Sequence, residues 1–243
     1  MPRLSGMHRI LTAFALSTLL ALPAAAQAPA GAALTPFTAT YEVLRNGSPI
    51  GESTLSLLRD SDGHWHYRST IHATHGLAAL FGADMQAVSV LRVDQGQPEA
   101  LQYEYRFDAM FKHKRQQIRV DWTTRRVHNE VDDRRAYTYA AEPGMVDSHS
   151  IPLALLTALH DGQRDIELPV AVKDRVEHQQ YRVTGPVQVK VPAGEFQALR
   201  VSRVGDEKAF TAWYDTGRFE TPVKLSQHSG GDLTLVLKSY RRP

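Results

Sequence analysis

The chain has no cysteine among its 243 residues, and this absence excludes several classes of protein. Without thiols there is no disulfide framework, thiolate metal site, iron–sulfur cluster or cysteine nucleophile. A lipoprotein anchor is excluded too, because it is attached to an N-terminal cysteine. Glycine (16) and proline (13) are too few for a collagen or a linker protein, and 42% hydrophobic residues are too many for a disordered chain.

Long hydrophobic runs are also absent after residue 26, so we expect no membrane span there. Residues 1–26 resemble a secretory signal peptide. Arg3 and Arg9 make a positive start, residues 10–22 form an apolar run shorter than the roughly 20 residues of a spanning helix, and Ala24–Ala26 suits a signal peptidase. We predict cleavage after Ala26 and a periplasmic protein.

The chain also has no large excess of positive or negative charge. The net charge is +2 with neutral histidines, and both arginines of the signal are lost on cleavage, which leaves the mature chain near neutrality. A surface field that collects nucleic acid is therefore not expected. We expect a flexible tether over residues 27–36 and one domain over residues 37–243.

The domain is dominated by period-two alternation, which is typical of β-strands. Phe37, Ala39, Tyr41 and Val43 alternate with polar residues, and Asn46-Gly47 then predicts a type I′ hairpin turn. We expect further strands near 84–94, 99–108, 112–122, 126–132, 135–140, 165–170, 175–183, 187–191, 196–204, 208–214, 221–227 and 233–241. Short turns between long strands favour antiparallel pairing in a curved sheet.

One helix is expected near residues 150–160. Ser148 or Ser150 can cap it, Pro152 falls in its first turn, and Gly162 ends it. The fold class predicted is therefore mainly β: a single curved antiparallel sheet, a half-barrel or incomplete barrel, covered by this α-helix.

Several segments carry a resemblance to a known family. Three of them are MVDSHSIPLALLTAL, VQVKVPAGEFQALRVSRV and WYDTGRFETPVKL. A fourth, FTATYEVLRNGSPIGESTLSL, matches the usual opening of the same family. The mature chain is identified as a member of domain-of-unknown-function family 3108, a family of exported bacterial proteins. The resemblance implies export and no assigned chemistry.

A second resemblance concerns the C-terminal hairpin. Trp213, the turn 215–217, Pro222 and the Gly-rich turn 229–231 follow each other as in the closing hairpin of LolA/LolB-type lipoprotein carriers. This similarity implies an incomplete barrel closed by a helix, with an apolar concave face.

Histidines suggest a metal site only weakly. His64 and His66 are two residues apart on a predicted strand, with His72 further along, so their side chains can point the same way. Arg68 and Thr70 share that face, which is typical of a solvated surface. We therefore assign no metal and no cofactor, and keep His64, His66 and His72 as a candidate set.

Two other clusters are given structural interpretations. The run 147–150, Asp-Ser-His-Ser, contains the residue types of a catalytic triad, but helix capping explains it and adjacency argues against a triad. Residues 112–115 with Arg119 and the pair 125–126 form the one basic concentration. It could hold a phosphate, a lipid headgroup or an acidic polymer, but we favour a solvated edge strand.

Aromatic residues on the predicted strands are the strongest sign of a binding surface. They form a β core or, in a half-barrel, part of an open apolar groove that takes up a ligand. The candidate ligand-binding residues are Trp65, Tyr67, Tyr103, Tyr105, Phe107, Trp122 and Trp213.

The sequence thus favours a non-enzymatic periplasmic binding or carrier protein for a hydrophobic or amphiphilic envelope molecule, such as a lipid. Two alternatives stay open. One is a structural or accessory envelope protein that binds another protein through a sheet edge. The other is a metal-dependent hydrolase that uses His64 and His66.

Overall fold

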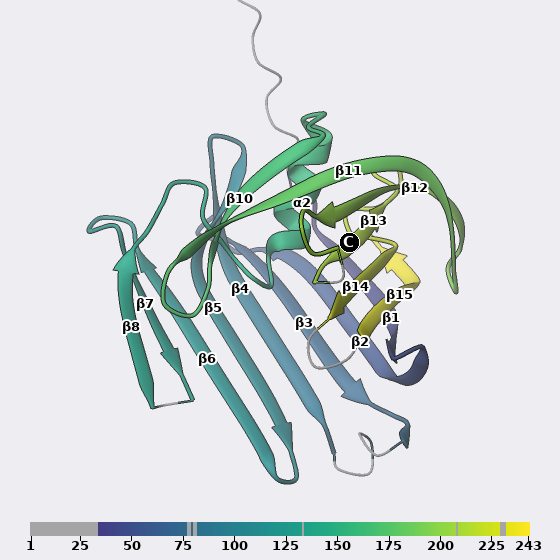
Figure 1. The fold of residues 1–243 in the computed structure, drawn as a ribbon, viewed down its shortest axis with the longest axis horizontal. Helices are drawn as coiled ribbons and strands as arrows, with labels where there is room; N and C mark the ends of the chain where they lie inside the picture. Colours follow the sequence, from purple (N-terminus) through teal and green to yellow (C-terminus); the bar gives the residue numbers. More distant parts are fainter. Residues whose placement is uncertain (1–33, 77–78, 80–81, 133, 208, 229–231) are drawn as a thin grey trace, which may run out of the picture.

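The computed structural model describes residues 34–243, apart from residues 77–78, 80–81, 133, 208 and 229–231. The predicted signal peptide, most of the predicted tether and the Gly-rich turn 229–231 lie outside the described residues. The fold is a sheet that curves around α2 (Ile151–His160), as Figure 1 shows.

The strands follow the predicted alternation closely. They are β1 (Phe37–Arg45), β2 (Ser48–Arg59), β3 (Trp65–Ala73), β4 (Asp84–Asp94), β5 (Gln97–Ala109), β6 (Lys112–Asp121), β7 (Arg126–Val131), β8 (Arg135–Ala140), β9 (Val146–Asp147), β10 (Asp165–Ala171), β11 (Val176–Val191), β12 (Gly194–Arg203), β13 (Thr211–Tyr214), β14 (Lys224–His228) and β15 (Asp232–Arg241).

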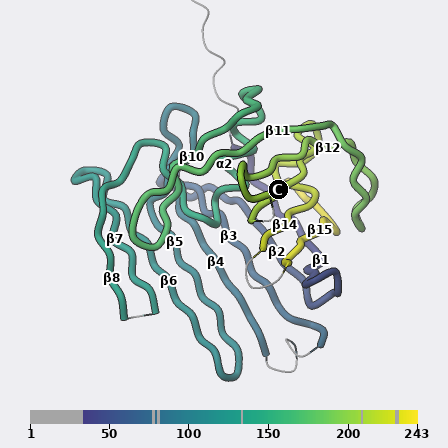
Figure 2. Tube along the Cα trace, viewed as in Figure 1, coloured from purple at the N-terminus to yellow at the C-terminus, as the bar shows by residue number. Residues whose placement is uncertain are grey.

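These 15 strands form one sheet in the order β8-β7-β6-β5-β4-β3-β2-β1-β15-β14-β13-β12-β11-β10-β9. The first and last strands pair with each other, and Figure 2 shows the purple and yellow ends of the tube side by side. The described sheet therefore ends at β8 and β9, in the middle of the chain. Every ladder is antiparallel except that of β9 with β10. The predicted class, mainly β with one open curved sheet and a covering helix, is confirmed.

The type I′ turn predicted at Asn46-Gly47 is present in the first hairpin. Asn46 and Gly47 both have positive φ, 49° and 79°, which is the requirement of a type I′ turn. The predictions for the second half of the chain need one correction. The two strands expected near 175–183 and 187–191 are a single strand, β11, whose register with β12 shifts between Thr184 and Val187.

The helix α2 is buried on all sides, from Ile151 to Leu159. Leu155, Leu156 and Leu159 pack against the strands β10 to β13, in a core cluster that includes Tyr181 and Tyr214. The Tyr214 hydroxyl donates to the Pro152 carbonyl at 3.0 Å, which fixes the first turn of the helix against the sheet. None of the helices in the described part of the chain combines the length and apolarity needed to cross a membrane.

Hydrogen bonds join the two halves of the sheet near its ends. Asn129 on β7 donates to the carbonyl of Lys173 at 2.7 Å, and Tyr139 on β8 donates to the carbonyl of Val172 at 2.8 Å. The backbone N–H of Ala100 on β5 also donates to the carbonyl of Met145, just before β9, at 2.8 Å. The open sheet is thereby held as a nearly closed shell around α2.

Candidate functional site

Three of the seven candidate aromatic residues line one cavity. Tyr67 on β3 and Tyr103 and Tyr105 on β5 surround a space of about 220 Å³ on the concave face. Side chains alternate between the two faces of β5. Tyr103 and Tyr105 point to the concave face, whereas Glu104 and Arg106 are exposed on the other face. The face predicted for these residues is therefore correct.

The other four candidates lie outside this lining. Trp65 is buried in the core around β1 and β2. The indole N–H of Trp122 donates to the Ala100 carbonyl at 3.0 Å, and the ring of Trp213 lies 4.8 Å from the Lys224 ammonium. Phe107 shares the face of Tyr105 but is not in contact with the cavity. The three tryptophans pack in or against the core, and the structure brings none of the four side chains to the cavity.

Residues distant in sequence complete the cavity. Pairing of β1 with both β2 and β15 brings β2 and the β14–β15 hairpin to the same space. Sequence reasoning missed this wall. The period-two alternation of β15 could have suggested its buried face, but nothing local indicates the strand pairing. The additional lining residues include Ser53, Leu55, His149, Leu225, Leu233 and Leu235.

A hydrogen-bonded network lies beneath the cavity, at the start of α2. Asp147 is fully buried and accepts hydrogen bonds from the Ser89 hydroxyl at 2.8 Å, from the backbone N–H groups of His149 and Ser150 at 2.9 and 3.0 Å, and from the Ser150 hydroxyl at 2.9 Å. The predicted capping by serine needs correction here. Ser150 is the N-cap residue but makes no side-chain cap: its hydroxyl donates to Asp147, which also accepts from the backbone N–H groups just before the helix.

The network fixes the tautomer of His149. Its Nδ1 lies 2.9 Å from the Ser89 oxygen. Because the Ser89 hydroxyl gives its only proton to Asp147, it accepts from His149, which must carry its proton on Nδ1. The Nε2 atom of His149 is then a bare hydrogen-bond acceptor. The ring is held between Tyr67 and Tyr103, with centroids 4.7 and 6.2 Å away.

Burial controls the charges in this network. It lowers the pKa of His149 to about 3, so the imidazole is neutral at physiological pH. It also raises the pKa of Asp147, while the hydrogen bonds from Ser89, Ser150 and the backbone oppose that rise. An efficient general base has a pKa near the working pH. The arrangement is therefore suited to hydrogen bonding rather than to proton transfer.

Two buried polar atoms have no hydrogen-bond partner in the described structure: Nε2 of His149 and Oγ of Ser53. Both residues line the same cavity. An unpaired buried polar group costs about 1–3 kcal/mol, so such atoms are rare in folded proteins. Their coincidence at one cavity distinguishes this site from the filled parts of the core.

The three candidate histidines do not form one cluster. His66 Nε2 lies 2.9 Å from an Asp60 carboxylate oxygen, and His64 approaches the same oxygen at 3.9 Å. His72, at the other end of β3, pairs instead with Asp84 at 2.7 Å. In the described ranges no group of three or more acidic or histidine side chains could hold a metal ion.

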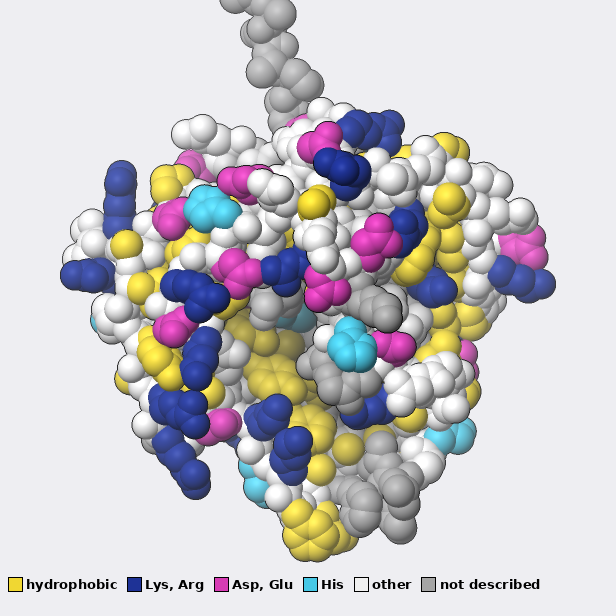
Figure 3. Space-filling view, in the orientation of Figure 1, with side chains coloured by type: hydrophobic (Ala, Val, Ile, Leu, Met, Phe, Trp, Pro, Cys, Tyr) yellow, Lys and Arg dark blue, Asp and Glu magenta, His cyan; other side chains and the backbone are white. Residues whose placement is uncertain are grey.

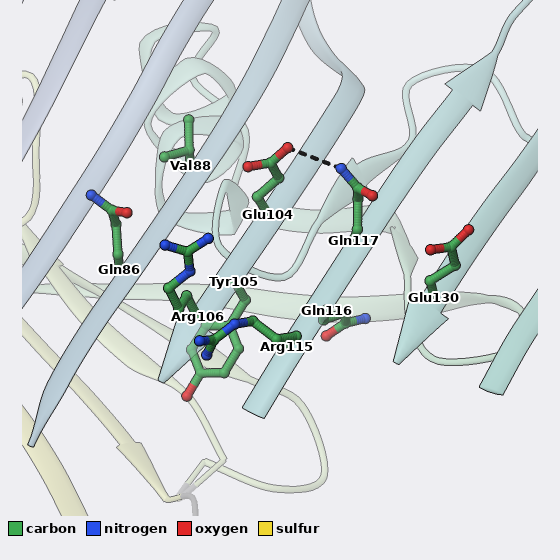
Figure 4. A pocket seen from close by; sticks show the side chains of 9 residues that line it. All are labelled: Gln86, Val88, Glu104, Tyr105, Arg106, Arg115, Gln116, Gln117 and Glu130. Carbon is green, nitrogen blue, oxygen red and sulfur yellow. Dashed lines mark hydrogen bonds between the residues drawn. The ribbon is translucent and has the colours of Figure 1, made fainter. Parts of the chain in front are cut away.

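A second hollow, of about 410 Å³, is polar (Figure 4). Most of its side chains come from the opposite face of β4 to β7, and Figure 4 shows the hydrogen bond from Gln117 to Glu104, which is 3.0 Å long. Arg106 and Arg115 stand side by side on neighbouring strands, directly across the β5–β6 ladder. Tyr105 also lines this hollow, but the other lining residues apart from Val88 are charged or carry side-chain amides, so the hollow is a weaker candidate for a ligand with an apolar body.

The basic concentration does not lie on an edge strand, as the sequence analysis proposed. It belongs to β6, which pairs with β5 on one side and with β7 on the other. Because β6 has no free backbone edge, its lysines and arginines are not needed to block pairing with another chain. The edge-strand interpretation is therefore wrong.

The fold and the cavity define an open, curved-sheet protein with a helix-covered concave face. Residues 37–238 match the family described as "Protein of unknown function (DUF3108)", and the chain belongs to that family. A crystal structure of a beta-barrel-like protein of domain of unknown function DUF1849 from Brucella abortus is similar, with a TM-score of 0.48 and 11% identity over 86% of this chain and 98% of that chain. A search of curated proteins finds no match. These comparisons do not show the LolA/LolB resemblance.

Proposed function

We propose that this protein is an exported, non-enzymatic binding protein that takes a small hydrophobic or amphiphilic molecule into the cavity on its concave face. The observation that carries the proposal is the cavity itself, with tyrosine and leucine walls and two buried polar atoms without partners. Ligand sites typically combine an apolar lining with a few polar groups that fix orientation.

The volume and charge of the cavity restrict the ligand. About 220 Å³ is smaller than the roughly 300–1,000 Å³ of sites for drug-sized ligands, so one acyl chain or one ring suits it better than a whole lipid. No described lining residue is a lysine or an arginine, and His149 is neutral. A neutral head group that donates a hydrogen bond therefore suits the site better than a carboxylate.

Export is part of the proposal, with the N-terminal segment as its support. If residues 1–26 are a signal peptide, N-terminal sequencing of the secreted protein should give Gln27 as the first residue. A secreted protein that begins at Met1 or Met7 would contradict this assignment. The periplasm is the compartment in which we expect the cavity to meet its ligand.

A second candidate function is supported by the edge of the sheet. β8 is the last strand of the described sheet, so its outer backbone groups are a template for a strand from another protein. An accessory protein of this kind would bind its partner at β8 and would not need the cavity. Binding of small apolar molecules at the cavity tyrosines would favour the first function over the second.

The test uses the mature chain and isothermal titration calorimetry with 1-octanol, octanoate and methyl octyl ether. We expect 1-octanol to bind most tightly, because it offers a hydroxyl donor to the cavity. Tyr105→Glu places an unpaired charge in the lining and should weaken 1-octanol binding at least tenfold, with the fold retained because Tyr105 is half-buried.

Phe107→Glu is the matched control, since it lies two residues further along the same face of β5 but outside the lining. It should leave 1-octanol binding unchanged. If no probe binds the wild-type chain, the proposed function is wrong. If Tyr105→Glu unfolds the protein, the tyrosine face is packed core, and that result would favour the accessory protein that binds a partner at β8.

A further inference from the structure

The tip of the β5–β6 hairpin is made of two exposed hydrophobic residues. Met110 and Phe111 form the whole turn between the strands, and they are 58% and 85% exposed. Two-residue hairpin turns usually take Gly, Asn or Asp, so the turn itself does not require large apolar side chains. Hydrophobic atoms appear at the lowest point of Figure 3, where Figure 1 places this tip.

Two lysines follow this tip on β6. Lys112 and Lys114 are exposed and form no ion pair with any described residue. The acid of the hairpin, Asp108, is already occupied: His113 Nδ1 lies 2.7 Å from it and the Arg115 guanidinium donates to it at 2.8 Å. The apolar tip is therefore flanked by uncompensated positive charge.

We propose that Met110 and Phe111 dock the protein on a bilayer surface that contains anionic lipids. The two side chains enter the boundary between headgroups and acyl chains, and Lys112 and Lys114 contact lipid phosphates. An apolar anchor combined with neighbouring basic residues is what reversible interfacial binding requires. This inference does not depend on the cavity or on its ligand.

The shape of the surface favours a bilayer over a protein partner. Two side chains at a turn project end-on and form neither a groove nor a flat patch, so a protein partner would need a preformed pocket for them. A fluid interface accepts a projecting tip without such a match. The charge around the tip also complements an anionic headgroup layer.

The experiment measures co-sedimentation of the mature chain with vesicles of phosphatidylethanolamine and phosphatidylglycerol, and with vesicles of phosphatidylcholine alone. We expect binding to the anionic vesicles that weakens as salt is raised. Met110→Ser/Phe111→Ser should reduce this binding at least tenfold without changing the thermal unfolding temperature, because both side chains are exposed. Lys112→Gln and Lys114→Gln should each reduce it about fivefold.

Leu58→Ser is the matched control, since Leu58 is 51% exposed but belongs to β2. It should bind vesicles like the wild type. Phe111→Trp should also show quenching by brominated lipids, whereas Leu58→Trp should not. The inference is overturned if the wild-type chain ignores anionic vesicles, or if the Met110→Ser/Phe111→Ser variant binds as well as the wild type. It is also overturned if a photo-cross-linker at position 111 couples to a protein and not to lipid.

Discussion

Two buried serines offer a test of the hydrogen bonding around the cavity. Ser53 on β2 is 1% exposed and Ser89 on β4 is 0% exposed. The Ser53 hydroxyl has no partner, whereas the Ser89 hydroxyl donates to Asp147 and accepts from His149. The same substitution, serine to alanine, should therefore change stability in opposite directions at the two positions.

The expected magnitudes follow from the partners. Ser53→Ala removes a buried hydroxyl that makes no hydrogen bond, so it should raise the free energy of unfolding by about 1 kcal/mol. Ser89→Ala leaves the Nδ1–H of His149 unpaired and takes one donor from Asp147, so it should lower that free energy by about 2 kcal/mol. For a domain of this size, these values correspond to unfolding temperatures about 3 °C higher and about 6 °C lower.

Urea unfolding of the mature chain near neutral pH measures both effects. The midpoint should rise for Ser53→Ala and fall for Ser89→Ala, with the slope unchanged in each case, since a changed slope would indicate an altered denatured state. If Ser53→Ala destabilises the protein as much as Ser89→Ala, the Ser53 hydroxyl is hydrogen-bonded in solution. That result would refute the reasoning that the Ser53 hydroxyl is an unsatisfied polar group of the cavity.

Two further predictions concern histidines. Burial lowers the pKa of His149 from 6.5 to about 3. Between these two pH values the unfolded chain binds a proton that the folded chain does not. The free energy of unfolding should therefore fall by about 1 kcal/mol per pH unit as the pH drops below 6.5. His149→Gln should remove this dependence in pH-resolved urea unfolding. The raised pKa of Asp147 acts in the opposite sense as the pH falls toward the ordinary value of 3.8, and Asp147 is present in both proteins. His64→Gln and His66→Gln should each change stability by no more than about 0.5 kcal/mol, and stoichiometric zinc that is lost in the double variant would contradict the surface assignment.

The strands and the covering helix could be predicted because their signals are local. Alternation of side chains decides which face of β5 is buried, and it places Tyr103 and Tyr105 inside and Glu104 outside. Asn46-Gly47 decides the first turn in the same way. These features depend on residues that are neighbours in sequence, and they needed no knowledge of the rest of the fold.

The cavity could be predicted only in part, because one of its walls depends on strand pairing between distant residues. The ladder between β1 and β15 brings Leu233 and Leu235 to Ser53, and no local pattern specifies that ladder. His149 was hidden for another reason. The capping interpretation concerns only Asp147 and the serines, of which Ser150 hydrogen-bonds to Asp147 just before α2, and it assigns nothing to the imidazole.

The strand β5 connects the two proposed surfaces. Tyr105 lines the cavity, and Phe111 at the hairpin tip follows six residues later, which at about 3.3 Å per residue is at most about 20 Å along the chain. Docking of the tip would therefore hold the cavity close to the bilayer surface. A binding protein for apolar molecules gains from this arrangement, because the transfer of such a molecule through water is the unfavourable step. The two surfaces have separate chemistry, one neutral and aromatic and the other apolar and cationic, so variants of either should leave the other unchanged.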